Sequence, residues 1–139
     1  MPEESTTPDL VELAREAFEA ADRRDFDVFV SIYAPDAVLE SMGMGTSFEG
    51  VAAIRGFFED FTSAYEEYGV EPEEILDLSN GVVFGVIVQQ GRLVGSSAHV
   101  QMRFASVAVF ADGLLVRHTL YTDIDEGRAA AERLARERG

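Results

Sequence analysis

The sequence of 139 residues contains no cysteine, no tryptophan and no lysine, so all eleven of its basic residues are arginines. Without cysteine it cannot form thiolate nucleophiles, disulfides or cysteine-zinc sites, and without lysine it cannot form a Schiff base. The longest apolar run, Val82–Val88 with its one glycine, is far shorter than the roughly 20 residues of a membrane-spanning helix. The first five residues are acidic and polar, unlike a secretion signal. We therefore expect a cytoplasmic protein without a membrane-spanning segment.

Positive charge is scarce, and the formal net charge is −15. The excess of acids is uneven, because residues 1–77 hold twenty acids and four arginines whereas residues 78–139 hold six acids and seven arginines. An acidic surface repels phosphate backbones and anionic lipids. We therefore expect neither nucleic acid nor a membrane as a partner. A neutral or apolar small molecule fits this composition better.

The chain length is typical of one domain, and we expect a flexible tail over residues 1–8 and a single domain over residues 9–139. Thr7 and Pro8 are residue types that favour the cap and the first position of a helix. Apolar residues then recur every three or four positions, which predicts an amphipathic helix. These residues are Leu10, Leu13, Ala14, Ala17, Phe18 and Ala21.

Two further helices are predicted before residue 70. Asp25 is placed to cap a short helix that includes Tyr33 and ends before Pro35. Residues 37–41 predict a strand, and residues 42–46 predict a loop. A long aromatic helix is then expected from Gly50 to Gly69.

The second half of the chain predicts strands near residues 72–79, 82–91, 97–111 and 114–123. They are separated by Asn-Gly, Gln-Gly and Asp-Gly pairs, which favour tight hairpins. A short helix is expected after Asp123. The order predicts an α+β domain in which a curved antiparallel sheet wraps around three helices. Because residues 82–111 contain no acid and are apolar on both faces, we expect a homodimer through the outer face of the sheet.

Several local strings in this order resemble the nuclear transport factor 2-like, or SnoaL-like, superfamily of cone-shaped domains. The strings are RDFD at 24–27, YAPDAV at 33–38, FEGVAAIRGFF at 48–58, RFASV at 103–107, DG at 112–113 and YTD at 121–123. The resemblance implies a cone whose mouth admits a mostly hydrophobic ligand. Members of the superfamily include ketosteroid isomerases, limonene epoxide hydrolases, polyketide cyclases, dehydratases and noncatalytic domains, so the resemblance does not define a reaction.

The catalytic groups of the well-known relatives are missing here. The resemblance places the isomerase tyrosine at Ala17, its general base at Ser41 and its proton donor at Ser106. For the epoxide hydrolases, it places one aspartate at Leu120, and the strand for the arginine and the other aspartate is apolar over residues 82–88. Neither mechanism transfers to this chain.

His118 is the candidate catalytic residue. Alternation divides the side chains of a strand between two faces, and the resemblance implies that Ser106 and His118 lie on the inner one. An ordinary pKa of about 6.5 suits proton transfer at neutral pH. In the enzymatic interpretation it moves a proton in an isomerisation, cyclisation or dehydration. In the alternative interpretation it is a wall residue whose ring nitrogens are bonded to Ser106 or Tyr33.

The other candidates are predicted to bind a hydrophobic, oxygen-bearing ligand, with hydroxyls that orient its oxygen and apolar side chains that form the wall. They are Tyr33, Ser41, Met42, Phe57, Phe61, Phe104, Ser106 and Leu120. Glu40 faces outward by alternation unless a bulge turns it inward, and His99 is expected on the outer face or at an interface.

No cofactor and no metal site are expected. The two histidines lack a metal-binding spacing, and Gly43-Met44-Gly45 does not extend into a dinucleotide-binding motif. Two noncatalytic alternatives stay open at this point. The chain is either a pure ligand-binding module, or an interaction domain whose cone is filled by its own side chains.

Overall fold

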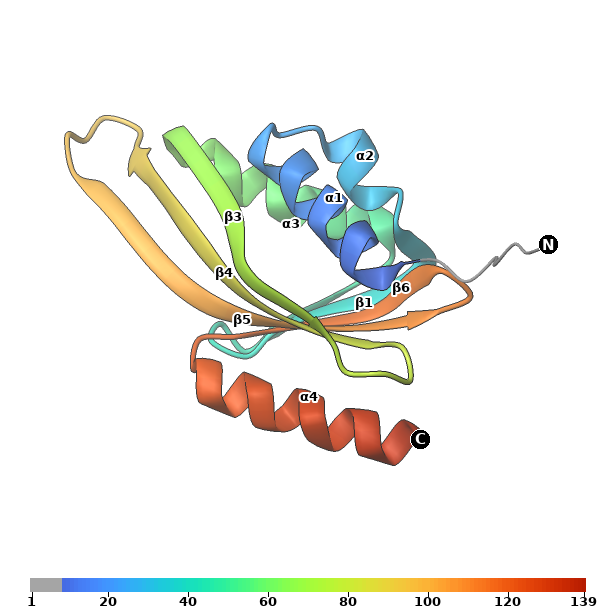
Figure 1. The fold of residues 1–139 in the computed structure, drawn as a ribbon. Coiled ribbons are helices and arrows are strands. Elements are labelled where there is room, and N and C mark those ends of the chain that lie inside the picture. The colour runs from blue at the N-terminus through green and yellow to red at the C-terminus, as the bar shows by residue number, and fades with distance from the viewer. Residues whose placement is uncertain (1–8) are drawn as a thin grey trace.

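The computed structural model describes residues 9–139. A six-stranded curved sheet carries three helices on its concave face and one helix on the opposite face (Figure 1). The predicted tail, with Thr7 and Pro8, lies outside the described residues. The elements are α1 (Leu10–Asp22), α2 (Phe26–Val30), β1 (Tyr33–Ser41), β2 (Thr46–Glu49), α3 (Val51–Ser63), β3 (Tyr65–Asp77), β4 (Val82–Leu93), β5 (His99–Ala111), β6 (Leu114–Tyr121) and α4 (Ile124–Arg138).

The strands are ordered β2-β1-β6-β5-β4-β3, and the sheet stays open with β2 and β3 at its edges. The predicted α+β class and curved sheet are confirmed, but the sheet is mixed rather than wholly antiparallel. The exception is the pair β1 and β6, which run parallel. Most of the chain lies between these two strands, so no tight turn forces them to run in opposite directions.

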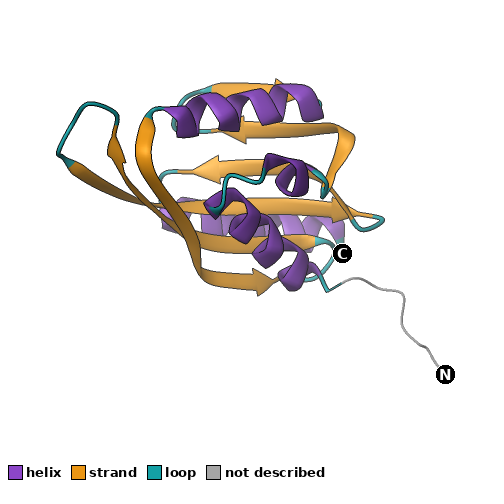
Figure 2. Ribbon diagram, turned by 90° about the horizontal axis from the view of Figure 1, so that it is seen from above, coloured by secondary structure: helices purple, strands orange, loops and turns teal. Residues whose placement is uncertain are grey.

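Seen from above, α1, α2 and α3 lie over the sheet (Figure 2). The main core fills the space between these helices and the concave face, where Leu39, Ile54 and Ile87 are fully buried. Asp25 caps α2 as predicted, because its Oδ1 accepts a hydrogen bond of 3.3 Å from the amide of Val28. The cap of α1 is Asp9.

Two predicted helix ends are wrong. Tyr33 does not belong to α2 but begins β1. The long helix ends at Ser63, and both Tyr65 and Tyr68 belong to β3. A register shift after Tyr65 lets these two tyrosines, three residues apart, both contact Phe61 from a strand. This spacing is also that of a helix face, which is why the sequence pattern alone predicts a longer helix.

α4 packs on the outer face of β4, β5 and β6, and with 15 residues it is longer than the short helix predicted from the sequence. Val82, Phe84 and Val86 form a second core with Ala131 and Ala135 of α4. The apolar outer face of β4 is therefore buried within one chain, and the argument for a homodimer from its exposure is wrong. Among residues 9–139, no helix is long and apolar enough to cross a membrane.

Candidate functional site

A cavity of about 340 Å³ lies between the three helices and the concave face of the sheet. Aromatic side chains form much of its wall, because α1, α2 and α3 all contribute phenylalanines. Phe57 and Phe61 stack on α3 with ring centroids 6.1 Å apart, and Phe58 meets Phe29 edge to face at 4.8 Å. The cavity can therefore hold a small molecule with a large apolar surface. This volume counts against the interpretation in which the cone is filled by its own side chains.

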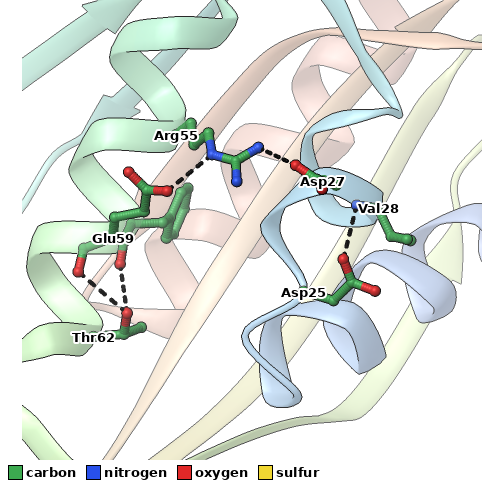
Figure 3. Close-up of polar contacts among 7 residues, drawn as sticks. Asp25, Asp27, Val28, Arg55, Glu59 and Thr62 are labelled. Atoms are coloured by element: carbon green, nitrogen blue, oxygen red, sulfur yellow. Dashed lines mark hydrogen bonds and ion pairs between the residues drawn. The ribbon is translucent and has the colours of Figure 1, made fainter.

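An ion pair connects α2 and α3, the two helices that form much of this wall (Figure 3). Arg55 of α3 reaches Asp27 of α2 with a nitrogen to oxygen distance of 2.6 Å, and it also binds Glu59 at 2.9 Å. Both hydrogen bonds raise the pKa of the Arg55 guanidinium. One turn further along α3, the Thr62 hydroxyl donates to the carbonyl of Phe58 at 2.9 Å, so it is already used within its own helix.

His118 lies on the cavity wall at the junction with a smaller inner cavity of about 20 Å³. Its Nδ1 is 2.8 Å from the hydroxyl of Tyr33, and its Nε2 is 2.6 Å from the hydroxyl of Ser106. All three side chains are buried. Both ring nitrogens are therefore occupied, as the wall-residue interpretation expects.

Burial also sets the charge of this cluster. Desolvation lowers the pKa of His118 to about 4, so the imidazole is neutral at pH 7. The same effect raises the pKa of Tyr33 well above its ordinary value. A neutral imidazole holds one proton on one of its two nitrogens, and either hydroxyl can donate or accept. Both ring nitrogens therefore have partners within the protein, Tyr33 and Ser106.

The structure separates the predicted site residues into three groups. His118 and five of the predicted binding residues line the main cavity, and these five are Ser41, Phe57, Phe61, Phe104 and Leu120. Tyr33 and Ser106 lie behind His118 and line the inner cavity. Met42 does not line the main cavity and is 54% exposed, whereas its neighbour Met44 does line it.

Glu40 and His99 do not reach the cavity. The carboxylate of Glu40 faces outward and pairs with Arg117 at 2.8 Å, and it accepts a 3.3 Å hydrogen bond from Thr119. Alternation along β1 predicted this direction. His99 is exposed at the start of β5.

Sequence reasoning missed several lining residues. Phe18, Phe26 and Phe58 were treated as helix core, although the same helical stripe that forms a core also forms the cavity wall. Tyr68 was placed on the wrong element. Gln89 was not singled out, although it is the one amide among the inward-facing residues of β4, which are otherwise apolar or glycine. That break in the apolar pattern is the signal that could have identified it.

Aspartate, glutamate and arginine side chains are missing from the main cavity wall within the described part of the chain. Residues 9–139 likewise contain no group of three or more histidine, aspartate or glutamate side chains placed to hold a metal ion. The polar lining atoms belong to hydroxyl, amide and imidazole groups. An arrangement of this kind can hydrogen-bond a neutral ligand, but it offers no carboxylate for general-base chemistry.

The open, curved sheet with helices on its concave face defines a nuclear transport factor 2-like domain, as the resemblance implied. The model of the SnoaL-like domain family matches residues 14–118, and the chain belongs to that family. A comparison with curated proteins gives no match.

Solved structures with this fold include proteins of different description. A putative polyketide cyclase from Sinorhizobium meliloti is 25% identical, with a TM-score of 0.66 over 78% of this chain and 93% of the other. A Mycobacterium tuberculosis protein in complex with estradiol-17beta-hemisuccinate is 18% identical, with a TM-score of 0.71 over 83% and 94% of the two chains. A hypothetical protein from Catenulispora acidiphila with a ketosteroid isomerase-like fold, in complex with trimethylamine, is 16% identical, with a TM-score of 0.73 over 91% and 94%.

Proposed function

We propose that the protein binds a neutral, hydrophobic, oxygen-bearing small molecule in the main cavity. The observation that carries this proposal is the cavity itself, which combines a volume of about 340 Å³ with an aromatic wall and a few uncharged polar groups. The acidic surface disfavours nucleic acid and anionic membranes as alternative partners. Relatives with the same fold hold small molecules, which supports the same use of the cavity here.

The site supports binding better than proton transfer. Catalysis by His118 at neutral pH needs a free ring nitrogen aimed at the ligand, but Tyr33 and Ser106 occupy both nitrogens. The low pKa of His118 further reduces its strength as a base. Because His118 is buried and neither of its ring nitrogens is free to face a ligand, a noncatalytic binding role is favoured for this residue.

Proton transfer through His118 is the second candidate function. It is favoured by the position of the imidazole on the cavity wall and by the buried chain of three exchangeable groups from Tyr33 through His118 to Ser106. An isomerisation, cyclisation or dehydration is the reaction class that such a group can serve. Replacing His118 with Phe then abolishes turnover of a bound substrate. Unchanged turnover removes His118 from any mechanism.

Cavity binding is tested with the neutral fluorophore N-phenyl-1-naphthylamine. Leu120→Trp places a larger ring in the cavity and is expected to weaken binding at least tenfold. Leu114→Trp is the matched control, because Leu114 lies on the same strand, is 37% exposed and does not line the cavity. Equal binding by the wild type and both variants would place the fluorophore elsewhere and overturn the proposal.

Native mass spectrometry of the freshly purified protein complements this assay. A defined small mass that stays bound in the wild type and is lost in Leu120→Trp would provide a natural ligand. The same spectra report the oligomeric state. The homodimer through the outer face of the sheet stays a prediction, and a monomer at micromolar concentration would contradict it.

A further inference from the structure

One polar side chain in the main cavity lacks the hydrogen bonds that burial requires. Gln89 lies on β4 in the same inward register as Val83 and Ile87, and only 5% of its surface is exposed. Its neighbours across the sheet are Val70 on β3 and Met102 on β5. Neither neighbour can donate or accept a strong hydrogen bond, so the amide is flanked by apolar side chains on both sides.

The amide of Gln89 has one weak contact. Its Nε2 is 3.5 Å from the hydroxyl of Tyr65, and among residues 9–139 its Oε1 has no hydrogen-bond partner. Turning the amide by 180° exchanges the two atoms and leaves one of them without a partner. A primary amide can make about four hydrogen bonds, and a buried amide without them destabilises the folded state. A buried amide without partners in a cavity of this size is available to hydrogen-bond a polar group of a ligand.

We propose that Gln89 anchors the polar end of the ligand, an inference that rests on the proposed function of the cavity. The amide offers a donor and an acceptor side by side. The complementary ligand is a neutral molecule that carries an acceptor and a donor next to each other, as in a carboxamide or a hydroxy-carbonyl group. Its apolar body packs against the aromatic wall of α3, including Phe57 and Phe61.

The surroundings of Gln89 select against an anion. A carboxylate has acceptors only, so one of its oxygens would face Oε1 of Gln89 without a proton between them. No arginine lines the cavity in the described part of the chain to compensate that charge. The site therefore distinguishes a carboxamide from a carboxylate of the same shape.

The position of Gln89 also orients the ligand. Through β5, His118 is in register with Val83 of β4, six residues from Gln89. At about 3.3 Å per residue, this separation is about 20 Å along the strand. A ligand anchored at Gln89 thus has its polar end far from His118.

The test uses two probes of nearly equal shape, naphthalene-2-carboxamide and 2-acetylnaphthalene, in which a methyl group takes the place of the NH2 group. Both accept a hydrogen bond, but only the carboxamide also donates one. Each displaces N-phenyl-1-naphthylamine from the wild type, and the carboxamide is expected to do so at about tenfold lower concentration. Gln89→Leu removes the preference, whereas Gln90→Leu retains it because Gln90 is exposed and lies outside the cavity lining.

A second measurement separates anchoring from a structural role. If the amide serves the ligand, Gln89→Leu leaves the melting temperature of the ligand-free protein unchanged or raises it, because it removes a poorly satisfied buried group. A lower melting temperature together with an unchanged probe preference would assign Gln89 to folding and overturn the inference.

The outcomes also distinguish this inference from the proposed function. If N-phenyl-1-naphthylamine binds in the cavity but the two probes compete equally, or neither competes, the assignment of Gln89 fails while the binding cavity stands. If the fluorophore is insensitive to Leu120→Trp and neither probe binds, both proposals fail.

Discussion

The hydroxyl of Ser106 lies 2.6 Å from Nε2 of His118, and this contact closes a buried chain that begins at Tyr33. Ser106 and His118 lie on the adjacent strands β5 and β6, and both point into the concave side of the sheet. Residues on a surface could exchange these bonds for water, but all three side chains here are at least 95% buried. The cluster therefore couples the stability of the fold to the protonation of one imidazole.

Removing either hydroxyl is expected to destabilise the protein. Ser106→Ala leaves Nε2 of His118 buried without a partner, and Tyr33→Phe does the same to Nδ1, so each costs about 1–3 kcal/mol in the free energy of unfolding. Urea denaturation at pH 7 measures both values. Ser41→Ala is the control, because Ser41 lines the main cavity and its side chain makes no hydrogen bond within the described residues. If Ser41→Ala lowered the free energy of unfolding as much as the other two substitutions, the special role of the cluster would be contradicted.

The stability contributed by a neutral His118 is expected to depend on pH. Its folded-state pKa is about 4, below the ordinary value of about 6.5. Between these values the unfolded chain binds a proton that the folded chain does not, so the free energy of unfolding decreases as the pH falls from 6.5 to 4. The full difference is on the order of 3 kcal/mol. Above pH 6.5 this contribution is constant.

His118→Leu isolates this effect from the titration of the many carboxylates. At pH 7 the variant is expected to have a lower free energy of unfolding than the wild type. This difference in free energy is expected to narrow as the pH falls towards 4. Chemical denaturation at half-unit pH intervals measures it. His99→Gln serves as the matched variant, since His99 is exposed and lies apart from the cluster. If the difference in free energy of unfolding between the wild type and His118→Leu stayed constant with pH, His118 would not titrate as proposed.

Alternation along a strand divided the residues of β5 and β6 into two faces, and the family resemblance indicated which face points inward. Ser106 and His118 follow this division, as does the outward direction of Glu40. The caps of α2 and α4 were also predictable. Asp25 and Asp123 accept hydrogen bonds from amides three residues later, an interaction that depends only on local chain geometry.

Other features depend on long-range contacts and could not be read from local patterns. Tyr65 and Tyr68 continue the helical spacing of α3, but pairing with β4 overrides that preference. The parallel pairing of β1 with β6 joins segments separated by most of the chain. Gln89 interrupts the apolar inner face of β4, yet its poor hydrogen bonding becomes apparent only when its cross-strand neighbours are known.

The close approach of α4 to the sheet depends on a glycine. A Cβ atom at Gly127 would lie 2.6 Å from the Cβ of Ala105, so Gly127→Ala forces the helix away from the outer face. We expect this substitution to lower the free energy of unfolding by about 1–3 kcal/mol. Gly56→Ala is the contrasting variant, because its Cβ enters open space on α3 and removes a helix-interior glycine. It should stabilise the protein by about 0.5–1 kcal/mol. Equal effects of the two substitutions in thermal denaturation would contradict tight packing at Gly127.

The cap of α4 gives a further test of how firmly this helix covers the sheet. Asp123 Oδ1 accepts a 3.0 Å hydrogen bond from the amide of Glu126, so Asp123→Ala should cost about 1 kcal/mol. Asp125→Ala is the control, because Asp125 lies in the first turn without serving as the cap. Hydrogen exchange should then accelerate in the amides of α4 and of the outer core around Phe84, while the amides of α1 change little. Uniform acceleration across the chain would show instead that α4 and the concave core unfold as one cooperative unit.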